Sequence, residues 1–160
     1  MVDINWDKTK AYAIGFGAIY INQKGREAKG IVSPGKETQD LKQEISNKLM
    51  KWIDVKNNQL VISKMYQQED IFWGDYAKEA PDLYVGFNLS YRASWQTAMG
   101  GVPQGLIEDN FKKWSGTHLC DPALIPGIIF SNQKITRDNP SIYDIAPTVL
   151  KVIGFDEERI

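Results

Sequence analysis

His118 is the only histidine in the sequence, so any imidazole-based metal site in this chain has to include it. It lies in the segment SGTHLCDP, residues 115–122, where a thiol and a carboxyl group follow closely. A catalytic zinc ion usually takes about three protein ligands from histidine, carboxylate or thiolate groups. On spacing alone, a single histidine in a glycine-containing loop is more often a hydrogen-bonded loop residue than a ligand. The candidate partners are Cys120 and Asp121 and, further back, Glu108 and Asp109.

Covalent catalysis has less support from the residues. A serine nucleophile of the triad type needs a general base that only His118 could provide, and no G-x-S-x-G motif occurs. Cys120 has no adjacent basic cluster, which favours a small buried residue over a reactive thiol. Gly15 and Gly17 lack the third glycine of a dinucleotide-binding loop, and close packing explains them better.

Two other clusters have both a functional and a structural interpretation. Lys24, Arg26 and Lys29 in a glycine-rich loop could receive a phosphate, although such charges are usually just solvated. Three aromatic residues of one long connection could line a base-stacking pocket, although such residues more often form a small local core. They are Tyr91, Trp95 and Trp114, and neither they nor the nearby Arg92 and Gln96 are assigned to a site.

The composition is that of an ordinary globular chain. Hydrophobic residues make up 42% and charged residues 24%, as in sequences that fold around a core. A length of 160 residues predicts a single domain, residues 1–160. With 19 basic and 20 acidic residues the net charge is −1, which disfavours binding to nucleic-acid polymers or anionic membranes. One cysteine excludes an intrachain disulfide.

Targeting signals are not expected in this chain. The N-terminal MVDINWDKTK is polar and charged, unlike a signal peptide, and the compartment stays open. The longest apolar stretches, residues 14–21 and 125–130, are too short to span a bilayer. We therefore expect a soluble chain without a membrane partner.

The first third of the sequence predicts two short strands, or one bent strand, followed by a helix. Residues 10–22 are rich in β-formers and are interrupted only by Gly15 and Gly17. Residues 23–37 are typical of a long surface loop. Apolar residues then recur at helical spacing, which predicts a helix over about 38–54 with Thr38 and Asp40 in a capped, acidic first turn.

The remaining sequence alternates strands with helices. Residues 59–66 alternate like a half-buried strand, and residues 82–87 and 125–132 are typical of buried strands. Residues 89–115 predict a long irregular connection. Asp144 is expected to cap a helix that ends at Gly154, with Ile145, Val149, Val152 and Ile153 facing inward. This alternation predicts an α/β sandwich with a mixed sheet flanked by helices.

Several ordered segments resemble the C-terminal portion of alkaline-phosphatase superfamily enzymes, most closely the type I phosphodiesterase/nucleotide pyrophosphatase branch. The family has a Gly-x-His motif before a core strand and then a helix of the Asp-Ile-Ala-Pro-Thr type. Here these are residues 116–118, 126–132 and 144–153. The segments KAYAIGFGAIYIN, KGREAKGIV and APDLYVGFNLSYRASWQTAMGG also resemble family members, in the right order. The fold implied is a partial alkaline-phosphatase-like sandwich.

The resemblance implies that His118 ligates one of two zinc ions, with Asp121 in a supporting position. Leu119 departs from the glycine that relatives commonly have after this histidine, which puts the local loop shape in question. The family's serine or threonine nucleophile, an early aspartate and an Asp-His pair come from segments upstream of the motif, and none is found here. We therefore expect a C-terminal fragment of a larger metallohydrolase.

The expected function is that of a zinc-dependent phosphodiesterase or nucleotide pyrophosphatase acting on nucleotides, and the isolated chain is expected to be inactive. Its partners would be a nucleotide or other phosphodiester substrate and the rest of the catalytic domain. One alternative is a non-catalytic binding or assembly module derived from this fold. Another is part of a related phosphonate or phosphomonoester hydrolase, because the superfamily shares its metal core.

Overall fold

The structure is a computed structural model that describes residues 4–101, 103–116 and 118–155. Contacts within the chain divide it into two compact units, Met1–Pro126 and Gly127–Ile160, and each is described by itself. Helices and strands are both present, so the predicted α/β class is confirmed. The single domain expected over residues 1–160 stays a prediction.

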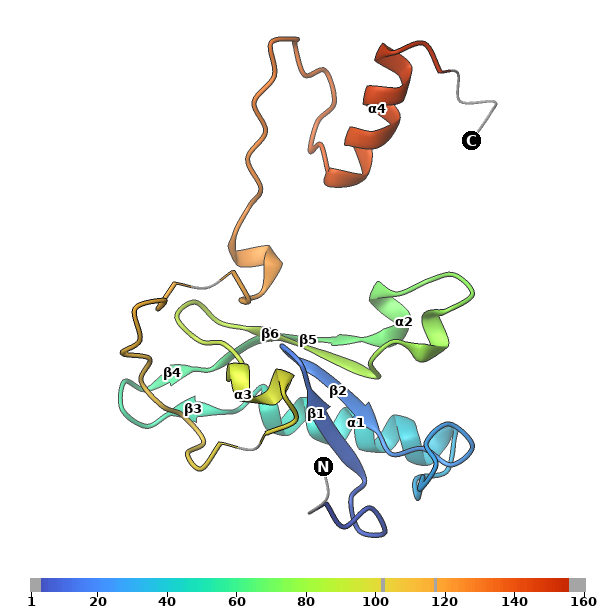
Figure 1. The fold of residues 1–160 in the computed structure, drawn as a ribbon, viewed down its shortest axis with the longest axis vertical. Helices are drawn as coiled ribbons and strands as arrows, with labels where there is room; N and C mark the ends of the chain where they lie inside the picture. Colours follow the sequence, from blue (N-terminus) through green and yellow to red (C-terminus); the bar gives the residue numbers. More distant parts are fainter. Residues whose placement is uncertain (1–3, 102, 117, 156–160) are drawn as a thin grey trace. The chain divides into compact units, whose positions relative to one another are not determined.

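The first unit is built on a four-stranded sheet (Figure 1). Its order is β1-β2-β6-β5, and each pairing within it is antiparallel, so the mixed sheet that we predicted is wrong. The chain joins β1 to β2 by a hairpin, and antiparallel strands can be joined in this way without a crossover helix. The strands are β1 (Ala11–Ile14), β2 (Ala18–Ile21), β5 (Ile62–Gln67) and β6 (Leu83–Phe87).

Two glycines make the β1–β2 hairpin possible. Gly15 and Gly17 have φ angles of 73° and 131°, which other residues rarely adopt. A Cβ atom on Gly17 would also lie 3.1 Å from the Val85 carbonyl oxygen of β6. Of the two expected possibilities, two strands form, and the expected close packing is found at Gly17 but not at Gly15, where a Cβ would meet no atom within 4 Å.

The helix α1 (Lys36–Leu49) begins two residues earlier and ends earlier than predicted. Its N-cap is Gly35 with φ 86° and no side-chain cap, while Thr38 donates to the Ser33 carbonyl at 2.9 Å. The apolar residues at 52 and 53 lie outside the helix because Ile53–Asp54 forms β3, paired with β4 (Gln59–Leu60). The predicted strand over 59–66 is thus divided between β4 and β5.

The core of the unit lies between the sheet and α1, which runs beside the strands (Figure 1). Ile45 and Leu49 of α1 pack against this core. Because they are four residues apart, they share one face of the helix. The core cluster consists of Ile19, Val61, Ile62, Leu83, Val85 and Phe87.

The chain after β6 is mostly irregular, as predicted for residues 89–115. It contains α3 (Trp95–Ala98) and the 3-10 helix η2 (Pro122–Leu124). The short α2 (Gln68–Ile71) and the 3-10 helix η1 (Ala77–Glu79) connect β5 to β6. The buried strand that we predicted over 125–132 is wrong, because Ile128 and Phe130 are exposed and no strand pairing is described there. Instead, Cys120 makes the bridge to Phe87 of β6.

The second unit contains the 3-10 helix η3 (Ile142–Asp144) and α4 (Ile145–Val152). Gly154 has φ 88° beyond the end of α4, consistent with the predicted helix stop. Asp144 does not cap α4 with its side chain but accepts from the Ser141 amide at 2.7 Å. The residues in and just after α4 that we expected to face inward are exposed, because a unit of this size has little chain with which to cover a helix. They are Ile145, Val149, Val152 and Ile153.

None of the helices in the described part of the chain combines the length and apolar character needed to cross a membrane.

Candidate functional site

The predicted metal ligand, His118, lies in the segment that returns from the irregular connection to the sheet. Its side chain is exposed, whereas Cys120 is half-buried and Asp121 is buried. The other two candidates are held elsewhere: Asp109 pairs with Lys56 at 2.7 Å, and Glu108 accepts from the Gly105 amide at 3.1 Å. Among the described residues no three histidine, cysteine, aspartate or glutamate side chains gather as a metal site. The predicted donors therefore do not form a ligand set by themselves.

Asp121 fixes the segment that carries His118 onto the sheet. Its amide donates to the Phe87 carbonyl at 2.7 Å, and its Oδ1 accepts from the Tyr66 hydroxyl at 2.7 Å. The same oxygen accepts from the Ala123 amide at 3.0 Å and so caps η2. A Cβ on Gly86 would lie 3.1 Å from the Asp121 Cγ, so glycine in β6 makes room for the carboxylate.

The protonation of this pair is set by its burial and hydrogen bonds. Burial raises the pKa of Asp121, but bonds from Tyr66, Ala123 and Ser63 outweigh it and leave that pKa below the ordinary value. Burial and the bond to Asp121 raise the pKa of Tyr66 to about 12. At neutral pH the pair is therefore a carboxylate that accepts from a protonated phenol. Such a carboxylate anchors the loop and is not open to solvent.

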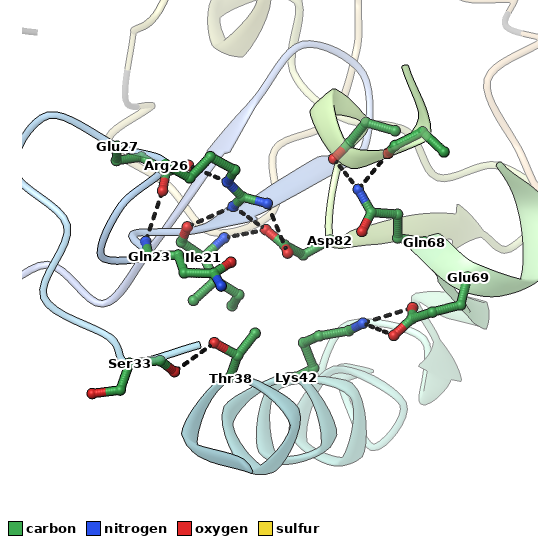
Figure 2. Close-up of polar contacts among 12 residues, drawn as sticks. Ile21, Gln23, Arg26, Glu27, Ser33, Thr38, Lys42, Gln68, Glu69 and Asp82 are labelled. Atoms are coloured by element: carbon green, nitrogen blue, oxygen red, sulfur yellow. Dashed lines mark hydrogen bonds and ion pairs between the residues drawn. The ribbon is translucent and has the colours of Figure 1, made fainter. Parts of the chain in front are cut away.

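Arg26, which we considered as a phosphate contact, is already occupied (Figure 2). Its guanidinium donates to both oxygens of the buried Asp82, at 2.6 and 3.1 Å, and to the Ile21 carbonyl at 2.8 Å. The Arg26 Nε also donates to the Glu27 Oε1 at 2.8 Å, and the bond to Asp82 chiefly raises the Arg26 pKa. This bidentate ion pair connects the loop after β2 to Asp82, the residue before β6.

A second ion pair, with a buried ammonium and a carboxylate 52% exposed, joins α1 to α2 and had no signal in the sequence (Figure 2). The Lys42 Nζ, on a side chain only 3% exposed, lies 2.7 Å from each carboxylate oxygen of Glu69. Burial raises the Glu69 pKa, but the bond from Lys42 leads the contributions that leave it lowered. Spacing could not predict this pair, because the partners are 27 residues apart.

A pocket of about 800 Å³ lies in the first unit, between the β3–β4 hairpin and the irregular connection. It brings together Tyr91 and Trp95, as the aromatic interpretation required, whereas Trp114 is not among its lining residues. Nothing in the sequence indicated that the β3–β4 hairpin contributes to this pocket, because Asp54 and Asn57 lie 37 and 34 residues before Tyr91 in the chain. Its lining includes Asp54, Asn57, Tyr91, Arg92, Trp95 and Lys112.

Comparison of the chain with protein-family models, curated proteins and solved structures finds no match.

Proposed function

We propose that this chain is the C-terminal part of a zinc-dependent phosphodiesterase or nucleotide pyrophosphatase that hydrolyses phosphodiester or pyrophosphate bonds of nucleotides. The proposal rests on the ordered segments that resemble this enzyme branch, above all residues 115–122. One structural observation carries it furthest. The exposed His118 lies three residues before the buried Asp121, whose carboxylate accepts from Tyr66 of β5 and whose amide donates to Phe87 of β6. Such an anchor would hold an imidazole in a fixed place.

In this proposal the chain contributes one metal ligand and no complete zinc site. About three protein ligands are needed, and the described residues do not bring three together. Zinc in such enzymes polarises the phosphoryl group and activates the nucleophile. His118 would supply one imidazole, and Asp121 would hold the loop. The remaining ligands and the serine or threonine nucleophile would come from segments outside this chain, so the isolated chain is expected to be inactive.

The test uses the complete gene product that contains this segment, supplied with zinc and a chromogenic phosphodiester, bis(p-nitrophenyl) phosphate. We expect His118→Ala to lower kcat/KM by more than about 100-fold, because losing even a hydrogen-bonded support of a ligand costs about 10- to 100-fold. Lys113→Ala changes an exposed residue of the same connection and is expected to retain activity. The isolated chain with zinc should show no turnover.

Other results of these assays would contradict the proposal or favour one of the alternatives. Equal activity of His118→Ala and the parent would exclude the ligand role. Turnover by the isolated chain that depends on His118 would show a complete site formed by self-association and would contradict the missing-segment proposal. Faster turnover of a phosphomonoester or phosphonate than of the diester would assign the related hydrolase. Self-association without zinc uptake would favour the non-catalytic assembly module.

A further inference from the structure

The pocket between the β3–β4 hairpin and the irregular connection has walls that are fixed by hydrogen bonds. The Tyr91 hydroxyl donates to the Asp54 Oδ2 at 2.9 Å and accepts from the Asn57 Nδ2 at 2.8 Å. Asp54 is buried, and its other oxygen accepts from the Lys56 amide at 2.9 Å. The Tyr91 ring is therefore held in place before any ligand arrives, which lowers the entropy cost of binding.

The acidic groups of the pocket wall already have donors. Asp54 accepts from Tyr91, Asp109 forms an ion pair with Lys56 at 2.7 Å, and Glu108 accepts from the Gly105 amide. Each of these carboxylates thus accepts at least one hydrogen bond, and Lys56 offsets the charge of Asp109. This arrangement leaves the basic groups to determine which ligand the pocket prefers.

Arg92 brings a guanidinium group to the pocket wall. Its side chain lines the pocket and is half-buried, yet within the described residues it makes no hydrogen bond or ion pair. A guanidinium presents five donors in a planar fork that matches carboxylate and phosphate oxygens. Partial burial without a partner is costly for such a group, and an anionic ligand would satisfy it.

Trp95 supplies an aromatic surface three residues further along. Its side chain is half exposed, and the Lys112 Nζ lies 4.7 Å from the ring centroid. A cation over the ring restricts its orientation, and Lys112 adds positive charge to the wall that Arg92 also lines. Flat aromatic ligands gain affinity by stacking on such a ring, whatever their edge substituents.

We infer that this pocket binds a small molecule in which an anionic group is attached to a flat aromatic moiety, with the anion on Arg92 and the ring on Trp95. A volume of about 800 Å³ is within the ordinary range for a ligand of this size. The anion can be a phosphate or a carboxylate, since the guanidinium fork accepts both. Binding needs no metal, so this inference goes beyond the proposed hydrolase and does not depend on it.

The pocket wall includes a residue close to His118 in the sequence. Ser115 belongs to its wall and lies three residues before the histidine, so their Cα atoms are at most about 11 Å apart. The wall of the pocket therefore continues into the segment that carries His118.

The test is calorimetric titration of the chain, in EDTA, with 5′-AMP, adenosine, ribose 5-phosphate and indole-3-acetate. AMP should bind at least about tenfold more tightly than adenosine or ribose 5-phosphate, because each lacks one recognised part. Arg92→Gln should weaken AMP binding about 10- to 100-fold, and Trp95→Ala about tenfold. Arg137→Gln and Trp114→Ala remove the same side-chain types from exposed positions outside the pocket and should bind normally.

AMP binding and phosphodiester hydrolysis can be lost independently of each other. His118→Ala should keep full AMP affinity, so loss of hydrolysis with retained binding leaves this inference intact. Tighter binding of indole-3-acetate than of AMP would support the pocket and identify carboxylates as its anions. Failure of every probe to bind at millimolar concentration would overturn the inference, as would unchanged affinity in Arg92→Gln. If Trp95→Ala does not fold, as judged by circular dichroism, Arg92→Gln alone decides.

Discussion

At the residue scale, the bond between Tyr66 and Asp121 determines how firmly the His118 segment is held on the sheet. The hydroxyl donates to the Asp121 Oδ1 at 2.7 Å, and Asp121 is 1% exposed. Tyr66→Phe removes this donor from a buried carboxylate, so we expect unfolding free energy at pH 7 to fall by about 1–3 kcal/mol. Urea titration measures this change through the midpoint and the slope.

The effect of Tyr66→Phe on the free energy of unfolding should also depend on pH. The folded-state pKa of Asp121 lies below its ordinary value of 3.8, so its stabilisation is present above that pH and is lost as pH falls through the lowered pKa. Without the Tyr66 bond this pKa rises, and the stability gap between Tyr66→Phe and the parent should narrow below about pH 4. Tyr76→Phe, at a 79% exposed position, is the matched control. A gap that is absent at pH 7, or that widens in acid, would contradict the assigned anchor.

At the scale of elements, the pair Lys42–Glu69 is expected to hold α2 against α1. Glu69→Ala leaves the buried ammonium of Lys42 without its carboxylate, whereas Lys42→Met replaces the ammonium by an apolar chain of similar length. We expect a loss of about 1–3 kcal/mol for Glu69→Ala and less than about 1 kcal/mol for Lys42→Met. The difference is measured by urea unfolding of both variants and their double mutant.

A surface pair on the same helix provides the control. Lys36 and Asp40 of α1 also form an ion pair, but their side chains are 87% and 64% exposed. Asp40→Ala should therefore cost no more than about 0.5 kcal/mol. If Glu69→Ala costs no more than Asp40→Ala, the burial of Lys42 contributes nothing to the docking of α2.

The elements that could be predicted from the sequence are those defined by local signals. Gly15 and Gly17 predicted the β1–β2 turn because a positive φ is a property of the residues themselves. The apolar run 125–132 predicted a strand that the structure does not form, because apolar character alone does not provide a partner strand. The Arg26–Asp82 pair joins residues 56 apart, and the pocket joins residue 54 to residue 95, so spacing gave no signal for either. The ligand role of His118 stays a prediction, and the bond between Tyr66 and Asp121, 55 residues apart, had no signal in the spacing.

At the scale of the whole molecule, the buried hydrophobic residues of the described chain run from Ile19 to Phe87, within the first unit. The returning segment that pairs with β6 is also complete before Pro126. Because the hydrophobic core drives cooperative folding, a chain that ends at Pro126 should fold by itself. It should show one sigmoidal urea transition with the same midpoint by tryptophan fluorescence and circular dichroism. Non-coincident transitions, or an unfolded spectrum in buffer, would mean that residues 127–160 are required and would support the single domain expected from the length.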